Sequence, residues 1–443
     1  MTDVRETTAT IEAAEASIVG GAGSANAADP AAGADAGRPG NETLSIGIVC
    51  YPGLGGSGVI ASDLAVGLAA RGHVVHVIAT APPTRALPEG DRIFFHEVAV
   101  SEAPLFQHPP YALAVAAAIV GIHGKHRLDL VHSHYAVPHA VSAWIAGQVL
   151  GANSPRLVDT LHGTDVTRVD SDPAYREIVR FAVAASDGIT VPSRFLRDEA
   201  YASLGVPADR AIEIVPDFVD TDHFRPAPRR APARLERLFA AAGGGNDRAC
   251  GGGGDVGGPF LFHVSNFRAV KRMGDLIEVL ARIRRQLPAR LVLVGDGPER
   301  ETAATRAREL GVDGSVCFVG KRKEFIEDLA QADAFLLPSE TESFGVAALE
   351  ALSAGVPVFG YRVGGLPEVV VDGVGVLVAP RDVDALAAAV VEALTTEGRI
   401  AALGLAARAH VLANFRREPA IEAYEHFYRR VLARRSRSRE GQP

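Results

Sequence analysis

Residues 44–80 carry the pattern that decides the fold: LSIGIVCYPG (44–53), then DLAVGLAARGH (63–73), then VVHVIAT (74–80). The first and last segments are apolar and rich in Ile and Val, which is typical of buried strands. The middle segment has the apolar spacing of a helix, and Gly72 is placed to end it. A strand, a helix and a second strand in this order predict a βαβ unit with parallel strands.

The alternation continues through LDLVHSHY, AVSAWIAGQVLG, PRLVDTLHG, PAYREIVRFAVAASD and GITVPS. It restarts at residue 259 with PFLFHVSNF, GDLIEVLARIRRQL, ARLVLVGDG, a helix from Glu299, SVCFVG, EFIEDLAQA and DAFLLPS. We therefore predict an α/β protein with two doubly wound, Rossmann-like domains, at residues 43–225 and 259–414. Such domains should face each other across a cleft at the carboxyl ends of their strands.

Four further segments lie outside these domains. Residues 1–42 have almost no large apolar side chains, which predicts a disordered tail. Residues 226–258 read as a linker with a Gly-rich insertion around Gly251. Residues 415–435 are expected to form a C-terminal helix that crosses back to the first domain, and residues 436–443 a loose tail.

Composition narrows the class of protein. The 443 residues are 47% apolar and 22% charged, with a net charge of −8 and a pI of about 6.0, which argues against nucleic-acid binding. The N-terminus lacks the basic start and apolar core of a secretory signal, and no apolar run reaches the roughly 18 residues of a membrane span. The three cysteines show no CxxC spacing. We expect a cytoplasmic protein without stable membrane insertion, and the sequence leaves a homodimer open.

Residues 339–357, SETESFGVAALEALSAGVP, outline a ligand site. Ser343, Phe344 and Gly345 fall where a strand turns into a helix, so their backbone N–H groups are unpaired donors suited to a diphosphate. With Glu342 in the loop and Glu350 about two turns into the helix, one carboxylate could reach a sugar and the other a ribose hydroxyl. The alternative is a solvated Glu and an N-cap Glu.

Several segments together resemble the retaining glycosyltransferases of family four, which have the GT-B fold. They are CYPGLGGSGVIASDLA, HSHYAVPHA, TLHGTDVT, HVSNFRAVKR, VGDGPE and SETESFGVAALEA, and the resemblance spans roughly residues 44–432. The combination is most similar to members that transfer N-acetylglucosamine from UDP-N-acetylglucosamine to the hydroxyl of L-malate, the first step of bacillithiol biosynthesis. No cofactor is implied.

For the donor, the resemblance implies that Arg268 and Lys271 stabilise the charge that collects on the departing phosphate. It also implies that Glu342 contacts the donor sugar and that Glu350 accepts from the ribose. The glycine-rich loop with Gly55, Gly56, Ser57 and Gly58 lets backbone approach the substrate. The alternative for Arg268 and Lys271 is a solvated basic turn. Arg272 is adjacent to Lys271, so the sequence does not separate their roles.

For the reacting centre, the resemblance places His162 beside the transferred sugar, where it hydrogen-bonds rather than acts as a base. L-Malate is a dianion, so its pocket needs a cation: Arg180 is our candidate, in competition with Arg176 and with a plain surface role. Ser57, Tyr135 and Thr160 could supply hydrogen bonds to the acceptor.

A metal site is not expected. His132 and His134 share one strand face and His139 is near, but no carboxylate in the sequence nearby completes a set, and family-four enzymes generally show no metal requirement. Asp217 stands where relatives are expected to have Asn. Because an inward carboxylate would repel phosphates, we expect Asp217 to point away.

Two rival functions remain. One keeps the fold and the donor but changes the acceptor to another small molecule or a lipid-linked sugar. The other is a catalytically silent protein that binds a nucleotide-sugar, and a UDP-sugar epimerase is a related reading. Donor binding without turnover would support the silent protein, whereas a changed sugar without any acceptor would support the epimerase.

Overall fold

The protein was analysed as a computed structural model. It describes residues 43–53, 56–83, 85, 87–88, 90–99, 110–167, 173–207, 209–228, 258–322 and 324–440. The predicted tail at residues 1–42, the Gly-rich insertion around Gly251 and the loop residue Gly55 lie outside the described residues.

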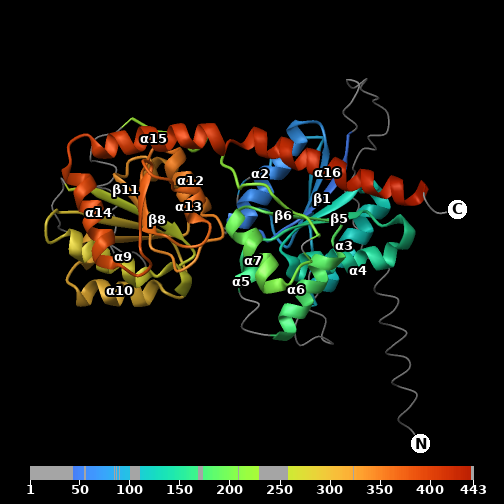
Figure 1. Cartoon of the computed structure of the whole chain (residues 1–443), viewed down its shortest axis with the longest axis horizontal. Helices are drawn as coiled ribbons and strands as arrows, with labels where there is room; N and C mark the ends of the chain where they lie inside the picture. The colour runs from blue at the N-terminus through green and yellow to red at the C-terminus, as the bar shows by residue number, and fades with distance from the viewer. Residues whose placement is uncertain are drawn as a thin grey trace, which may run out of the picture. The chain divides into compact units, whose positions relative to one another are not determined.

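The first lobe is built on a seven-stranded parallel sheet with the order β3-β2-β1-β4-β5-β6-β7 (Figure 1). Its strands are β1 (Ser45–Val49), β2 (Val74–Ala79), β3 (Ile93–Glu97), β4 (Leu130–His134), β5 (Arg156–Thr160), β6 (Gly188–Val191) and β7 (Ile212–Ile214). Its helices are α2 (Gly56–Ala70), α3 (Tyr111–His126), α4 (Val141–Leu150), α5 (Thr164–Thr167), α6 (Pro173–Ala185) and α7 (Arg194–Leu204). The strand order reverses between β1 and β4.

The second lobe is built on a six-stranded parallel sheet with the order β10-β9-β8-β11-β12-β13. Its strands are β8 (Phe260–Ser265), β9 (Arg290–Gly295), β10 (Val316–Gly320), β11 (Ala334–Leu337), β12 (Val358–Tyr361) and β13 (Gly375–Val378). Its helices are α9 (Met273–Ile283), α10 (Arg300–Glu309), α11 (Ile326–Leu329), α12 (Val346–Ser353), α13 (Leu366–Val369), α14 (Val383–Thr395) and α15 (Arg399–Asn414). Here the order reverses between β8 and β11, so each lobe has the switch point at which doubly wound sheets bind ligands.

Two consecutive helices tie the lobes together. α15 packs on the second lobe through Ala407 and Val411. α16 (Arg417–Glu440) then packs on the first lobe, where Tyr424 and Tyr428 join the core formed by β1 and α2 (Figure 1). Because α16 runs to Glu440, residues 436–440 are helical, although we predicted them to be part of a loose tail.

Other differences from the sequence prediction are local. The strands β3, β7, β12 and β13 and the helices α3 and α7 were not predicted, and the helix predicted over EFIEDLAQA is a single turn, α11. The glycine-rich loop is shorter than expected because α2 begins at Gly56. A Cβ on Gly58 would lie 2.6 Å from the carbonyl oxygen of Tyr51, so only glycine lets this helix start so close to the end of β1.

Cys50 is free, whereas Cys317 is disulfide-bonded, which the cysteine spacing did not indicate.

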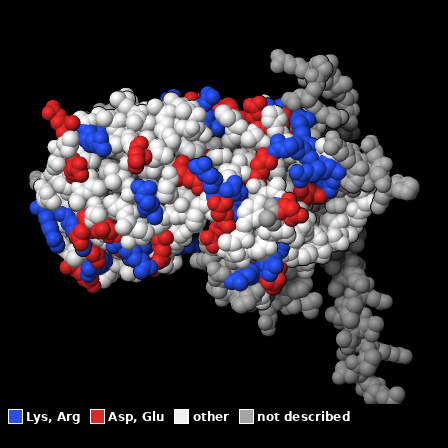
Figure 2. All heavy atoms as spheres, viewed as in Figure 1, with Lys and Arg blue, Asp and Glu red and all other residues white. Residues whose placement is uncertain are grey.

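The surface charges are mixed. On the face in Figure 2, Lys and Arg side chains lie next to Asp and Glu in several places, separated by broad uncharged areas. None of the described helices has the length and apolar content needed to cross a membrane.

Candidate active site

A cavity of about 1200 Å³ is lined by residues from both lobes at the carboxyl ends of their strands. That volume is large enough for a nucleotide-sugar with a small acceptor. Ten of the residues predicted from the sequence line it: Gly56, Ser57, Tyr135, His162, Arg268, Lys271, Glu342, Ser343, Gly345 and Glu350. The two switch points therefore bring together side chains that are almost 300 positions apart in the chain.

Lys271 and Glu342 form an ion pair inside this cavity. Lys271 Nζ lies 2.5 Å from Glu342 Oε1, and their side chains are 20% and 10% exposed. Lys271 ends a 3-10 turn that follows β8, and the backbone N–H of Glu340 donates to the carbonyl of Val270 at 2.8 Å, which ties this turn to the loop after β11. The arrangement places a cation and a carboxylate side by side where a diphosphate and a sugar would meet.

Arg272 has a different environment from Lys271. Its guanidinium makes two hydrogen bonds to Asp275, of 2.7 and 2.9 Å, and it is not among the residues that line the cavity. Lys271 and Arg268 do line it. The structure thus separates the two basic neighbours that the sequence left open.

The loop that carries Glu342 is fixed by backbone contacts. Gly345 has a φ of +109° and caps α12, and the backbone N–H of Gly365 donates to the carbonyl of Glu342 at 2.8 Å. From the first lobe, the hydroxyl of Ser193 donates to the carbonyl of Ser343 at 2.6 Å. Phe344 is buried in the core of the second lobe, so its side chain holds the loop and only its backbone remains a candidate ligand.

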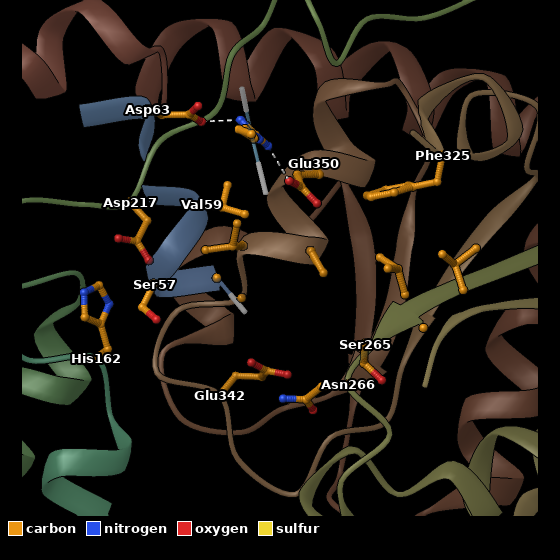
Figure 3. A pocket seen from close by; sticks show the side chains of 18 of the residues that line it. Ser57, Val59, Asp63, His162, Asp217, Ser265, Asn266, Phe325, Glu342 and Glu350 are labelled. Atoms are coloured by element: carbon orange, nitrogen blue, oxygen red, sulfur yellow. Dashed lines mark hydrogen bonds and ion pairs between the residues drawn. The ribbon is translucent and has the colours of Figure 1, made fainter. Parts of the chain in front are cut away.

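Glu350 lies about one turn, rather than two, into α12, and it already has a partner. Arg85, from the first lobe, donates to Glu350 Oε1 at 2.8 Å and also pairs with Asp63 on α2 (Figure 3). Burial raises the pKa of Glu350 to about 7 and that of Asp63 to about 6, although Arg85 acts in the opposite direction on both. This three-membered ion cluster joins the lobes beside the position predicted for the ribose.

His162 follows β5 and lies on the first-lobe side of the cavity. Its backbone N–H donates to Asp165 Oδ2 at 3.3 Å, and its ring Nε2 lies 2.8 Å from Nδ1 of His134. Burial lowers the pKa of His162 to about 3, so the ring is neutral near pH 7. Beside it, the hydroxyl of Ser57 hydrogen-bonds to that of Tyr135 at 3.2 Å.

Asp217 does not point away from the cavity, contrary to our expectation. It lines the wall on the side where Ser57 and His162 lie (Figure 3), and among the described residues its Oδ1 has no hydrogen-bond partner. Burial raises its pKa to about 7, so a proton near neutral pH removes much of the repulsion between this carboxyl and phosphates that we had expected.

Two predicted acceptor residues are not brought to the cavity wall. Thr160 is buried behind it and hydrogen-bonds to His132 and Thr190. Arg180, on α6, is half-exposed and pairs with Glu177 at 3.0 Å. The acceptor roles of Thr160 and Arg180 therefore remain predictions that the geometry does not support.

Several lining residues were not predicted as site residues. They are Asp63 and Arg85 in the first lobe and Asn266, Lys321 and Phe325 in the second. Strand ends at a switch point could have suggested Asn266, which follows β8 directly, whereas Arg85 lies in a Pro-containing loop that offers no such guide. Within the described residues, no group of three or more His, Cys, Asp or Glu side chains is arranged to hold a metal ion.

The two doubly wound lobes and the cavity at the ends of their strands are those of the GT-B glycosyltransferases. Solved structures agree: sucrose-phosphate synthase from Thermosynechococcus elongatus superposes with a TM-score of 0.69 at 23% identity, over 88% of this chain and 99% of that one. Anabaena Alr3699/HepE in complex with UDP-glucose superposes with a TM-score of 0.67 at 19% identity, over 87% and 99% of the two chains.

Sequence comparisons give the family. Residues 54–223 match the family model "Glycosyltransferase Family 4" and residues 253–410 match "Glycosyl transferases group 1". The chain is 38% identical to the N-acetyl-alpha-D-glucosaminyl L-malate synthase of Bacillus anthracis, over 88% of this chain and 97% of that protein. It is 33% identical to a GDP-mannose-dependent alpha-(1-6)-phosphatidylinositol monomannoside mannosyltransferase of Mycolicibacterium smegmatis, over 68% and 76%. The chain therefore belongs to the family-four glycosyltransferases, which are retaining enzymes.

Proposed function

We propose that this enzyme transfers N-acetylglucosamine from UDP-N-acetylglucosamine to the hydroxyl of L-malate. The observation that carries this proposal is the 38% identity to the Bacillus anthracis synthase, which extends over 97% of that relative. Because the sequence similarity covers nearly the whole length of the relative, it includes both lobes and hence both sides of the cavity. The product would enter bacillithiol biosynthesis, as the sequence resemblance implies.

The cavity supports a division of roles between the lobes. Arg268 and Lys271 would hold the diphosphate of the donor, and Glu342, whose carboxylate touches Lys271, would contact the sugar. As the bond from the sugar to the phosphate lengthens, negative charge moves onto the phosphate, and cations fixed beforehand stabilise this state more than the ground state. Ser57, Tyr135 and His162 line the first-lobe side of the cavity, where Ser57 and Tyr135 would bind the acceptor and His162 the transferred sugar.

In the reaction, the malate hydroxyl oxygen forms a bond to the anomeric carbon on the face from which UDP leaves. The bond between that carbon and the β-phosphate oxygen breaks, and the hydroxyl proton passes to the departing phosphate. UDP carries away the bonding electrons and the proton, so the configuration is retained without an enzyme nucleophile. A double displacement would need two carboxylates roughly 5 to 5.5 Å apart on either side of the anomeric carbon.

The deciding experiment measures UDP release from UDP-N-acetylglucosamine with and without L-malate, with mass spectrometry of the product. A malate-dependent conjugate supports both the donor and the acceptor. Donor binding without this conjugate would refute the malate assignment and lead to a panel of other acceptors, with inositol phosphates and phosphatidylinositol glycosides among them because a mannosyltransferase that acts on the latter is also similar.

Arg180 gives a second test on the same proposal. If it reaches malate in the substrate-bound enzyme, Arg180→Ala should raise the KM for malate far more than the KM for the donor, with Arg176→Ala as the comparison on the same helix. A selective effect on the donor would remove Arg180 from the acceptor site.

A further inference from the structure

A pair of histidines connects the cavity to the interior of the first lobe. His134, the last residue of β4, is completely buried, whereas His162 lines the cavity. His134 Nδ1 lies 2.8 Å from His162 Nε2, and the two rings are nearly parallel, with an angle of 19° between their planes. One of these two nitrogens must therefore donate a hydrogen bond to the other.

His134 is held firmly in this place. Its carbonyl accepts from Nδ1 of His139 at 2.6 Å, and the Nε2 of His139 lies 2.9 Å from the hydroxyl of Tyr111. On its other side, its ring lies against that of His132, with 4.5 Å between the ring centroids. The His134 ring thus cannot turn without disturbing buried neighbours.

The direction of the hydrogen bond follows from the far side of the His134 ring. Its Nε2 is buried and has no hydrogen-bond partner among the described residues. If His162 donated, the proton of neutral His134 would be on this Nε2, and a buried N–H would be left unpaired. If His134 donates, Nε2 is only an unpaired acceptor, and orphaned buried N–H groups are the rarer of the two in proteins.

We propose that His134 is a positioning residue that donates from Nδ1 to Nε2 of His162 and thereby fixes the proton of His162 on its Nδ1. In this tautomer, neither ring nitrogen of His162 can take a proton from a substrate: Nε2 is occupied and Nδ1 is already protonated. His162 then serves the reaction as a hydrogen-bond donor. The inference concerns the free enzyme, and it rests on the proposed function only where turnover is used as a readout.

The direct test is the tautomer of His162 in the ligand-free protein. The chain contains 14 histidines, so the resonances of ¹⁵N-histidine-labelled protein are assigned by their loss in His162→Ala and His134→Ala variants. Protonated and bare ring nitrogens have well separated ¹⁵N shifts. A protonated Nδ1 on His162 supports the proposal, whereas a protonated Nε2 overturns it. This result does not depend on whether any variant is active.

Two substitutions then separate positioning from packing. His134→Phe keeps the ring volume but supplies no donor, whereas His134→Asn loses volume but can place an amide N–H near the position of Nδ1. Loss of a partner that orients a functional histidine typically costs about tenfold to a hundredfold, so we expect this loss in kcat for His134→Phe with little change in the donor KM. His134→Asn should recover most of the activity.

The opposite order of activities, with the Phe variant near wild type and the Asn variant impaired, would show a packing role and overturn the proposal. Failure of the malate reaction would concern the proposed acceptor and not the role of His134. If no malate conjugate forms but His162 is protonated on Nδ1, the proposed acceptor is wrong and the role of His134 stands, to be followed with the acceptor that is active.

Discussion

Arg85→Ala should destabilise the protein in a way that depends on pH. Arg85 is the shared partner of Glu350 and Asp63, whose side chains are only 9% and 8% exposed. Its guanidinium also lies 5.2 Å from the ring centroid of Phe224. Removing it leaves two carboxyl groups close together in a poorly solvated place, and breaking a buried ion pair from one side typically costs about 3 to 5 kcal/mol.

Protonation limits this cost. Burial already raises the pKa of Glu350 to about 7 and that of Asp63 to about 6, and Arg85 opposes this rise in both, so both pKa values should rise further in the variant. A group whose pKa is higher in the folded state destabilises folding as the pH rises through that value. We therefore expect a loss of about 3 kcal/mol at pH 8, where both carboxyls are mostly ionised in the wild type and lose Arg85 as their partner. At pH 6 we expect about 1 kcal/mol, because both carboxyls of the variant are then largely protonated.

The assay is urea unfolding at pH 6 and pH 8, followed by circular dichroism and by the fluorescence of the single tryptophan, Trp144, in the first lobe. Arg306→Ala is the control, since Arg306 pairs with Glu278 and Glu309 at the surface and its loss should have a smaller effect that changes little with pH. An equal loss at both pH values for Arg85→Ala, or a loss below about 1 kcal/mol at pH 8, would refute the argument that Arg85 compensates two buried carboxylates.

Three further predictions concern Lys271 and Gly364 in the second lobe and His76 in the first. Lys271→Ala should raise the activation free energy by about 2 to 4 kcal/mol, as for removal of one fixed donor at a reacting centre, and an unchanged kcat/KM would exclude this role. Gly364→Ala should lower activity, because Gly364 has a φ of +54° and a Cβ there would lie 2.0 Å from the carbonyl oxygen of Glu342. The control is Gly274→Ala, since a Cβ on Gly274 meets nothing within 4 Å. Burial lowers the pKa of His76 from 6.5 to about 3, so this group stabilises the fold above pH 6.5 and loses the effect as the pH falls. That loss should reach about 2 kcal/mol by pH 5 in unfolding titrations and be smaller in His76→Phe.

The sequence predicted most strands of both sheets, because buried parallel strands are short apolar runs that need no partner to be recognised, but it did not predict β7, β12 or β13. It missed β3 (Ile93–Glu97), which is only partly buried, and α3, whose sequence YALAVAAAIVGIHGKH has small residues and glycines but little apolar periodicity. α11 was predicted too long: of the residues EFIEDLAQA (324–332), only Ile326–Leu329 are helical.

The residues predicted for the site line the cavity most often where they follow a strand. Lys271, His162 and Glu342 each follow a strand of their sheet, so the topology alone brings them to one edge. Arg180 is in the middle of α6, where the rotation of the helix about its axis decides the direction of the side chain. Asp217 was misjudged because charge was assigned from residue type, while burial decides whether the carboxyl is ionised near neutral pH.

The sequence analysis treated each domain separately, so it could not predict the contacts that join the two lobes. Arg85 reaches Glu350, Ser193 binds the carbonyl of Ser343, and Glu368 of α13 accepts from the first backbone N–H groups of α7, Arg194 and Phe195, at 3.0 and 2.9 Å. All three join the first lobe to α12, to α13 or to the loop that carries Glu342. A helix N-terminus needs acceptors. The N-terminus of α7 has one in its own lobe, because the Ser193 hydroxyl accepts from the backbone N–H of Leu196 at 3.1 Å, and another across the cleft in Glu368. The loop that carries Glu342 is therefore positioned partly by the first lobe. If that lobe binds the acceptor, as we propose, acceptor binding has a physical route to affect this loop.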